Sequence, residues 1–418
     1  MPPCRLSADW VLPIASPPIG PGAVLIDEAG RIAAVGADAD VPHGPEPREH
    51  FPGCAIIPGL VNAHTHLELT GFDGLVPEHD FVAWIARVRA LKLERSAAEY
   101  LAAARRGLRD CFAAGVTTVA DTGDSGAVIE ALHEAGGSGI AYLEVFGPHP
   151  ADAAARVTEF RERLAGLRRF ETERIRLGAS PHAPYTVSGP LLELVAALAR
   201  AERLPLAVHI AESAAESELL ACAGGAFAEA WRRRGIPLPE SPGPTPVEWL
   251  ARHGALGAAT LCIHAVRVDR RDVDRLRAAG AAVAHCPRSN RRHGHGDAPL
   301  AAFLGAGLRV GVGTDSVASV SPLDLLAETR AAAALGGLDP GCALELCTIG
   351  AARALGLDAA IGSLEPGKWG DCAVVRLPPG VARERVAAAV LDGGAGDVVA
   401  TFVAGRPVHR TGRGTLPA

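Results

Sequence analysis

Eight short apolar runs, each followed by a segment rich in Ala, Leu, Arg and Glu, constrain the fold of this chain more than any other feature. The first run is AIIPGLVNAHTH from Ala55, and the last is RVGVGTDS from Arg309. Strand-like runs that alternate with segments of helical period predict βα units. Eight such units over about 300 residues predict an α/β protein with a closed, TIM-type (β/α)8 barrel.

Both ends of the chain have a different character. The segment from Val24 to Val35 reads VLIDEAGRIAAV, two apolar runs around an acidic Gly turn, which predicts a β-hairpin. The C-terminal stretch again contains short β-branched runs that are divided by Gly and Pro. We predict that residues 1–57 and 360–418 together form a small β-sandwich domain, and that residues 58–359 form the barrel.

The composition excludes several classes of protein. The chain has 47 acidic and 41 basic residues, so its net charge of -6 lacks the basic field that a nucleic-acid binder needs. The nine cysteines form no C-x-x-C pair, which indicates reduced thiols rather than a disulfide framework. No run reaches the roughly 18 apolar residues of a membrane span. We expect a cytoplasmic protein that binds neither nucleic acid nor a membrane.

Polar residues stand where the apolar runs end, which is where active residues of a (β/α)8 barrel lie. An H-x-H pair such as His64 and His66 is weak evidence by itself. A strand nevertheless points both imidazoles to the same face, which predicts two ligands of one metal ion. Further candidates at the ends of other runs strengthen that prediction: His182, His209, His264, His285 and Asp315.

Five runs give the chain a resemblance to a known family. PGLVNAHTHLE, HIAES from His209, IHAVRVD from Ile263, AHCPRSN from Ala284 and GVGTDS from Gly311 resemble, in order and spacing, motifs of the amidohydrolase superfamily. The resemblance is strongest to the branch of S-adenosylhomocysteine and methylthioadenosine deaminases, aminofutalosine deaminases and triazine chlorohydrolases. It implies a distorted barrel, one divalent metal ion per chain, and hydrolysis of an amine or halide from a heterocycle.

The resemblance also implies roles for individual residues. The implied metal ligands are His64, His66, His209 and Asp315. Three imidazoles and a carboxylate suit Zn²⁺, with Fe²⁺ as the alternative. The implied catalytic residues are Glu212, His264 and Asp315, and the implied substrate contacts are His182, His285 and Asn290. Lys92 and Lys368 lie outside the barrel strands, which favours one metal ion over two, although a bridging Glu144 is an alternative.

Glu212 is expected to protonate a ring nitrogen of the substrate, with a pKa raised by partial burial. The alternative is that His209, Glu212 and Glu216 mark one face of an amphipathic helix. Asp315 would also accept a proton from the attacking water, and His264 would stabilise charge on it. For these two residues the alternative is a strand-end side chain that caps the next helix.

Specificity is expected to come from loops after the strands. By resemblance, Trp84 would contact the base and Glu94 the ribose hydroxyls, although the stripe that contains Trp84 could equally belong to the core. Residues 231–249 form either a lid or a solvated loop. The glycines and arginines around His293 and His295 indicate a mobile loop rather than a second metal site.

Together these features predict metal-dependent hydrolytic deamination of a 6-aminopurine nucleoside, of the aminofutalosine or adenosine type, to the 6-oxo product and ammonia. No arginine stands near AYLEVFG, which argues against substrates that carry homocysteine. Deamination or dechlorination of a triazine or pterin is one alternative, and a non-catalytic barrel scaffold is another. The expected partner is a small heterocyclic amine, and a homo-oligomer stays an open alternative.

Overall fold

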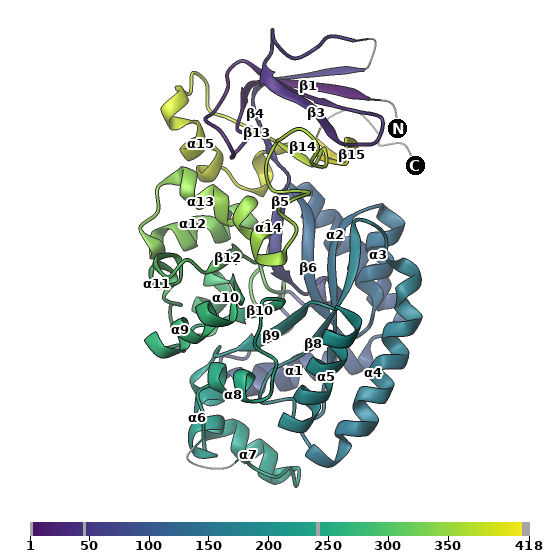
Figure 1. Ribbon diagram of the computed structural model, residues 1–418, viewed down its shortest axis with the longest axis vertical. Helices are drawn as coiled ribbons and strands as arrows, with labels where there is room; N and C mark the ends of the chain where they lie inside the picture. Colours follow the sequence, from purple (N-terminus) through teal and green to yellow (C-terminus); the bar gives the residue numbers. More distant parts are fainter. Residues whose placement is uncertain (1–2, 45–46, 240–242, 412–418) are drawn as a thin grey trace.

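Two β-sheets organise the structure, and both chain ends belong to the same sheet. The computed structural model describes residues 3–44, 47–239 and 243–411. Figure 1 shows the sheet built from both ends above the barrel.

Each apolar run contributes one strand to a parallel, eight-stranded sheet, in which neighbours along the chain are neighbours in space. The strands are β5 (Leu60–Thr65), β6 (Val116–Gly123), β7 (Ser138–Val145), β8 (Ile175–Pro181), β9 (Leu206–Ile210), β10 (Thr260–His264), β11 (Ala282–His285) and β12 (Arg309–Val312). The expected barrel is therefore confirmed. The first run is divided, because Ala55 to Pro58 pair with the other sheet and the barrel strand begins at Leu60.

The barrel closes where its last strand meets its first. Thr65 and Asp315 form a parallel bridge, and the N–H of Asp315 donates to the carbonyl of His64 at 3.1 Å. A Cβ on Gly313 would lie 2.7 Å from the backbone nitrogen of His64, so only glycine permits this approach. Closure therefore brings Asp315 beside His64, although 251 positions separate them in the sequence.

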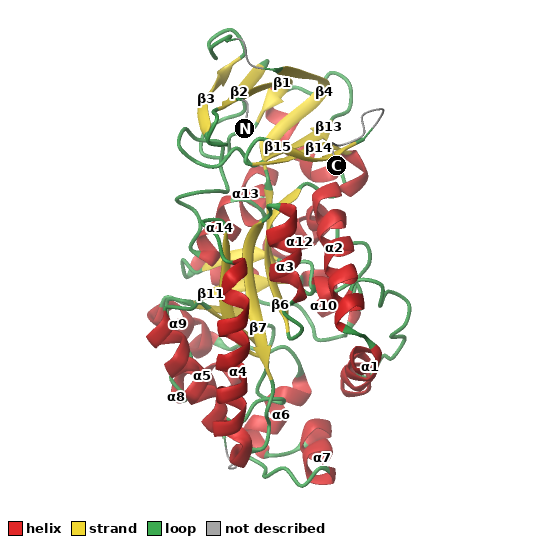
Figure 2. Cartoon of the chain, turned by 90° about the vertical axis from the view of Figure 1, so that its right-hand side faces the viewer, coloured by secondary structure: helices red, strands yellow, loops and turns green. Residues whose placement is uncertain are grey.

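Helices flank the barrel on its outside, and α1 lies at the edge of the molecule (Figures 1 and 2). They are α1 (Phe81–Glu94), α2 (Ala97–Ala113), α3 (Ala127–Ala135), α4 (Ala153–Leu167), α5 (Gly189–Glu202), α6 (Ala214–Cys222), α7 (Gly225–Arg233), α8 (Pro246–Arg252), α9 (Arg270–Ala279), α10 (Pro287–Arg292), α11 (Leu300–Gly305), α12 (Leu325–Gly336), α13 (Pro340–Leu346), α14 (Ile349–Leu355) and α15 (Val386–Asp392). Within the described parts of the chain, none of them has both the length and the apolar content of a membrane span.

The β domain is one mixed sheet of seven strands in the order β15-β14-β13-β4-β1-β2-β3. Its strands are β1 (Cys4–Val11), β2 (Gly22–Ile26), β3 (Ile32–Ala37), β4 (Arg48–Pro58), β13 (Cys372–Arg376), β14 (Val398–Val403) and β15 (Arg406–Arg410). β2 and β3 form the expected hairpin, and β4 pairs with β13 from the other chain end. That both chain ends build one β structure is thus confirmed, but the structure shows a single mixed sheet rather than the two packed sheets of the predicted β-sandwich. The domain boundaries at residues 57 and 360 stay a proposal.

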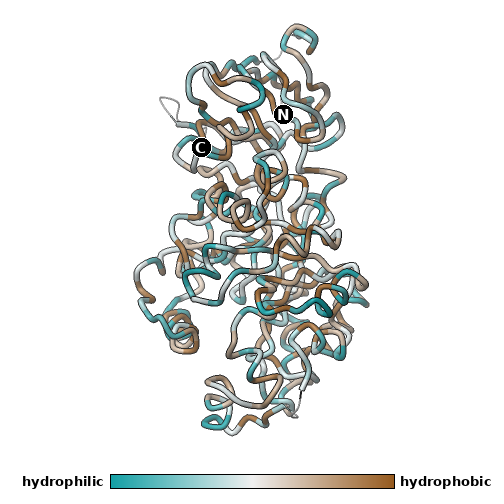
Figure 3. The backbone as a smooth tube through the Cα atoms, turned by 90° about the vertical axis from the view of Figure 1, so that its left-hand side faces the viewer, coloured by the Kyte–Doolittle hydropathy of each residue, from teal (hydrophilic) through white to brown (hydrophobic). Residues whose placement is uncertain are grey.

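Hydrophobic and hydrophilic stretches alternate along the chain (Figure 3). Inside the barrel, small strand residues such as Ala63, Ala120 and Ala207 pack with Ala351 and Leu355 of α14. A larger cluster joins the outer faces of the strands to the surrounding helices. The interior is therefore filled at the end that α14 covers, and the site lies at the opposite ends of the strands.

A buried ion pair joins the two sheets and carries a stability prediction. Asp371, just before β13, accepts two hydrogen bonds from the Nη2 of Arg174, just before β8, at 2.7 and 2.9 Å. Asp371→Ala would leave the guanidinium charge without its partner, so we expect the free energy of unfolding to fall by about 3–5 kcal/mol. Urea denaturation measures this loss. The exposed Asp392, changed to alanine, is the control and should shift stability by less than about 0.5 kcal/mol.

Candidate active site

Three imidazoles and a carboxylate meet at the carboxyl ends of β5, β9 and β12. The Nε2 atoms of His66 and His209 face each other at 3.3 Å. Asp315 Oδ1 lies 3.6 Å from the Nε2 of His66 and 3.7 Å from the Nε2 of His64. The structure therefore brings together all four residues that the resemblance implies as metal ligands.

Hydrogen bonds orient two of these imidazoles. The Nδ1 of His66 lies 2.8 Å from the carbonyl oxygen of Thr122, and the Nδ1 of His209 lies 3.2 Å from that of His182. A carbonyl only accepts, so each Nδ1 carries the proton and each Nε2 presents a lone pair. Two lone pairs that face each other across 3.3 Å are what a shared cation would stabilise.

His64 supports the same interpretation. It is fully buried, and neither of its ring nitrogens has a hydrogen-bond partner among the described residues. Burial lowers the pKa of His64 and also lowers the pKa of His66, to about 3, which keeps both imidazoles neutral. Neutral imidazoles with buried, unpartnered nitrogens fit a metal site, so this cluster can bind a metal ion.

Glu144, at the end of β7, adds a carboxylate to this cluster. One of its carboxylate oxygens, one ring nitrogen of His66 and one ring nitrogen of His209 all lie within 4.8 Å of one another. Burial raises the pKa of Glu144 to about 8, and its Oε1 has no hydrogen-bond partner among the described residues. A second metal ion bridged by Glu144 is thus compatible with the geometry.

Asp315 is held as an ionised carboxylate. Its Oδ2 accepts hydrogen bonds from Ser289 Oγ at 2.5 Å and Ser319 Oγ at 3.2 Å, and its Oδ1 accepts from the N–H of Ser316 at 2.7 Å. Burial acts to raise the pKa of Asp315, but the nearby imidazoles of His64, His264 and His66 outweigh it and hold the pKa well below its usual range. The helix-cap alternative for Asp315 is not what the structure shows.

Glu212 follows β9 and is 4% exposed. Its Oε1 lies 3.6 Å from His264 Nε2 and 3.3 Å from His295 Nε2, and its Oε2 accepts from the hydroxyl of Tyr185 at 3.4 Å. The expectation of a raised pKa is wrong. Burial does act to raise the pKa of Glu212, but His264 and His295 outweigh it and lower the pKa to about 2.

The alternative that placed Glu212 on a helix face is also excluded. His209 lies in a strand, and α6 begins only at Ala214. Glu216 of α6 instead accepts hydrogen bonds from the backbone N–H groups of Ala211 and Glu212, at 2.8 and 2.9 Å. Glu216 therefore fixes the backbone that carries Glu212.

His264 is oriented by a residue that was expected to contact the substrate. The Nδ1 of His264 lies 2.9 Å from Asn290 Oδ1, and the Nε2 of His264 faces Glu212. Asn290 and His285 are buried and are not among the residues that line the cavity described below. Of His182, His285 and Asn290, the structure brings only His182 to the cavity wall, where its Nδ1 lies 2.7 Å from Thr186 Oγ1.

Backbone strain concentrates at these strand ends. His264, Asp315, Ala211 and Ala265 have φ values of 71°, 56°, 52° and 47°, a region that residues other than glycine rarely adopt. Such strain persists only where the surrounding structure imposes it, and it is typical of functional sites. It supports placing the chemistry at this end of the barrel.

A cavity of about 730 Å³ opens above the cluster, a size that suits a small-molecule ligand. His66, His209, Glu212, His264 and Asp315 lie in its lining. Arg234 and Ile236, from the segment for which a lid was one alternative, also line it, while residues 240–242 of that segment lie outside the described residues.

Helix α1 forms one wall of the cavity. Trp84, Val88 and Lys92 line it, and the contact of Trp84 with a base stays a prediction. Glu94 is exposed and is not among the lining residues, which corrects the expectation that it contacts the ribose. Successive helical residues are about 100° apart, so a helix that turns Lys92 inward turns Glu94, two positions later, outward.

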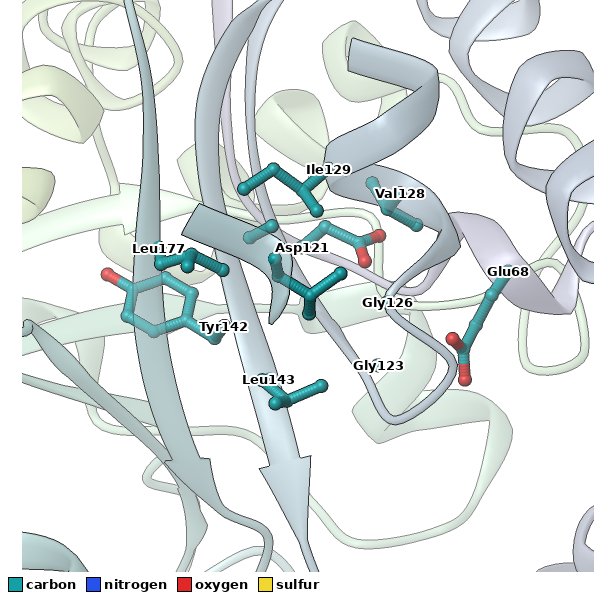
Figure 4. A pocket seen from close by; sticks show the side chains of 11 residues that line it. Glu68, Asp121, Gly123, Gly126, Val128, Ile129, Tyr142, Leu143 and Leu177 are labelled. Carbon is teal, nitrogen blue, oxygen red and sulfur yellow. The ribbon is translucent and has the colours of Figure 1, made fainter. Parts of the chain in front are cut away.

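A buried charge network holds α1 to the barrel. Glu68 accepts from Lys92 Nζ at 2.8 Å and from the backbone N–H of Ser125 at 3.0 Å, and Lys92 also pairs with Asp124. Figure 4 shows Glu68 beside the turn that carries Gly123 and Gly126, next to a small cavity of about 10 Å³. These contacts fix the position of α1 beside the site. No pattern in the sequence indicated the network.

The cavity wall contains arginines, although none of them comes from the AYLEVFG strand, β7. Arg156 and Arg163 of α4 line the cavity, together with Arg89 of α1 and Arg234. Arg163 donates to the carbonyl oxygen of Asp124, and Arg156 lies 3.0 Å from Glu159. The lack of an arginine near AYLEVFG therefore does not exclude substrates that carry homocysteine.

The segment of His293 and His295 differs from expectation. Both side chains are buried, at 9% and 4% exposure, and pack against Phe81 and Trp84 of α1, so the prediction of a mobile loop is wrong. His293 Nε2 lies 3.1 Å from the hydroxyl of Ser319. Both histidines therefore pack beside the site rather than in a solvated loop.

Comparisons with known proteins point to one family. The Amidohydrolase family matches residues 55–408. A 5-methylthioadenosine/S-adenosylhomocysteine deaminase of Halobacterium salinarum is 34% identical over 85% of this chain and 80% of its own length. An aminodeoxyfutalosine deaminase of Deinococcus radiodurans is 35% identical over 80% of this chain and 81% of its own length.

Solved structures show the same fold. An adenosine deaminase from Xanthomonas campestris with bound zinc superposes with a TM-score of 0.84 at 26% identity, over 97% of this chain and 92% of that one. The aminofutalosine deaminase of Helicobacter pylori, in complex with methylthio-coformycin, gives a TM-score of 0.83 at 22% identity, over 96% of this chain and 99% of that one.

Proposed function

The chain belongs to the amidohydrolase family, and from this membership we propose that it is a zinc-dependent aminohydrolase of a 6-aminopurine nucleoside. The proposed reaction exchanges the 6-amino group for the oxygen of water, giving the 6-oxo nucleoside and ammonia. One observation carries the proposal. A cluster that fits a metal ion and the carboxylate of Glu212 lie at the floor of one cavity of nucleoside size.

His64, His66, His209 and Asp315 would hold one zinc ion. When bound, the metal lowers the pKa of a coordinated water towards about 7 and so supplies the nucleophile at neutral pH. Ser289 and Ser319 engage one oxygen of Asp315 and leave the other towards the histidines, so that the carboxylate can also accept a proton.

Glu212 would act first as a base and then as an acid. Its lowered pKa means that the carboxylate is ionised at neutral pH, so it must take up a proton from the attacking water before it can donate one to a ring nitrogen. Asn290 holds His264, whose Nε2 can donate a hydrogen bond to the attacking oxygen as charge develops there. The chain thus supplies a route for a proton from water to the purine ring.

The cavity supports a nucleoside with an acidic side group. Trp84 supplies an aromatic face for a planar base, and the arginines in the wall supply positive charge for a carboxylate. The names of the two relatives, a 5-methylthioadenosine/S-adenosylhomocysteine deaminase and an aminodeoxyfutalosine deaminase, favour an adenine nucleoside. The cytoplasmic location and the homo-oligomer stay predictions from the sequence.

A substrate panel tests the proposal. Adenosine, 5′-methylthioadenosine, S-adenosylhomocysteine and aminodeoxyfutalosine are compared with adenine, 2′,3′-dideoxyadenosine, a triazine and a pterin, by ultraviolet absorbance and ammonia release. We expect ribosides to exceed adenine and the dideoxy analogue in kcat/KM, because the analogues lack the ribose hydroxyls. The difference should be about tenfold for each 1.4 kcal/mol of hydrogen bonding to those hydroxyls that is lost. A better triazine or pterin would refute the nucleoside assignment. A protein that neither contains nor takes up metal would support the scaffold alternative.

A further inference from the structure

His295 is a buried histidine for which the proposed reaction has no role yet. It stands in a tight turn after α10, in which Gly294 and Gly296 have φ values of 67° and 101°. These left-handed positions require glycine and let the chain place the imidazoles of His293 and His295 in parallel, with ring centroids 5.4 Å apart. The H-G-H-G pattern is thus a built turn that directs two side chains into the site.

The contact that His295 makes is with the proton-transferring carboxylate. Its Nε2 lies 3.3 Å from Glu212 Oε1, and no hydrogen bond satisfies this buried nitrogen among the described residues. The same oxygen lies 3.6 Å from His264 Nε2, and the other oxygen receives the hydroxyl of Tyr185. Because a buried nitrogen needs a partner, Glu212 is the acceptor within reach of His295.

The position of His295 is fixed from two further sides. Its backbone N–H donates to the carbonyl oxygen of Asn290 at 2.9 Å, and the side chain of Asn290 in turn orients His264. The ring of Phe81, the first residue of α1, meets the imidazole edge-on at 4.5 Å. Asn290 thereby sets the two imidazoles that face Glu212, and α1 closes over one of them.

We propose that His295 is a positioning residue for proton transfer. Its Nε2–H donates to Glu212 Oε1 and holds the carboxylate in the one orientation from which it takes up and delivers the proton. The inference rests on the proposed function. A carboxylate that loses one of its fixed donors samples other orientations, and small misplacements of a reacting group reduce turnover strongly.

Three substitutions at His295 separate donation from packing. A Gln side-chain nitrogen can reach the position of Nε2, whereas Asn is too short and Leu fills the space against Phe81 without a donor. We expect kcat to fall by about 10- to 100-fold in His295→Asn and His295→Leu, with KM within about threefold and metal content unchanged. His295→Gln should keep kcat within about threefold of the parent.

His253→Gln is the matched control. His253 also contacts a glutamate, Glu193, at 2.8 Å, but neither residue lines the cavity. It should leave kcat and KM unchanged. A kcat in His295→Asn and His295→Leu equal to that of the parent, or an equal loss in His295→Gln and His295→Leu, would overturn the positioning role.

A measurement without substrate keeps this inference separate from the proposed reaction. In zinc-loaded protein labelled with ¹⁵N-histidine, NMR should show a proton on the Nε2 of His295, assigned by its loss in His295→Gln. Glu212→Leu should shift that resonance because it removes the acceptor. A His295 protonated on Nδ1 alone, or a resonance indifferent to Glu212, would refute the inference even if a nucleoside is turned over. If no nucleoside is a substrate, the proposed function fails, and the NMR measurement still shows whether His295 donates to Glu212.

Discussion

Replacing His64 or His66 with alanine is expected to remove the bound metal and the activity together. Each substitution deletes one imidazole from a cluster that is buried and tightly spaced, and a water molecule in its place is a poorer ligand. We expect zinc content to fall from about one ion per chain towards zero after dialysis, with a loss of nearly all turnover. Elemental analysis and a steady-state assay on the same samples measure both quantities.

His253→Ala is the control for removing a histidine elsewhere, and it should keep both metal and activity. Full metal content with full activity in both His64→Ala and His66→Ala would show that the cluster is not the metal site. Elemental analysis also gives the number of metal ions per chain. Two per chain in the parent would favour the bridging arrangement in which Glu144 takes part.

Glu212→Gln is expected to reduce turnover by about 10²–10⁴-fold while the metal stays bound. Glutamine keeps the size of the side chain and can still contact His264 and His295, but its amide cannot take a proton from water and deliver it to a ring nitrogen. The kcat of the variant, measured with its zinc content, checks this expectation.

Asp315→Asn provides the contrast, because Asp315 has both a ligand role and a proton-accepting role in the proposal. It should weaken metal binding as well as turnover, whereas Glu212→Gln should change turnover alone. Normal turnover in Glu212→Gln would move the proton donor to another residue. Loss of zinc in that variant would instead make Glu212 part of the metal site.

The fold was predictable because its pattern is local. Each barrel strand is a short apolar run, and each is followed by a segment of helical period, so the order of the units alone predicts a parallel barrel. The convergence of His64, His209 and Asp315 follows from that fold, since carboxyl ends of barrel strands meet at one face. The motifs also carried the family resemblance, which the comparisons confirm.

The surroundings of the site were not predictable in the same way. The contacts of Lys92 with Glu68 and Asp124 hold that face of helix α1 towards the barrel, so Glu94 on the other face points outward. The arginines of the cavity come from α1, from α4 and from the segment after α7, so no single motif contains them all. Sequence spacing does not determine how a helix rotates about its axis once it leaves the strand.

The sequence by itself determined the barrel, the composite β domain and the residues that meet at the strand ends, because periodicity and strand order act through the backbone. Only the tertiary structure decided the protonation of Glu212 and the place of His295. Burial alone would raise the pKa of Glu212, and the direction reverses because two imidazoles from distant parts of the chain stand within 4 Å of it. Electrostatic effects depend on distances in space, and a linear chain does not contain those distances until it folds.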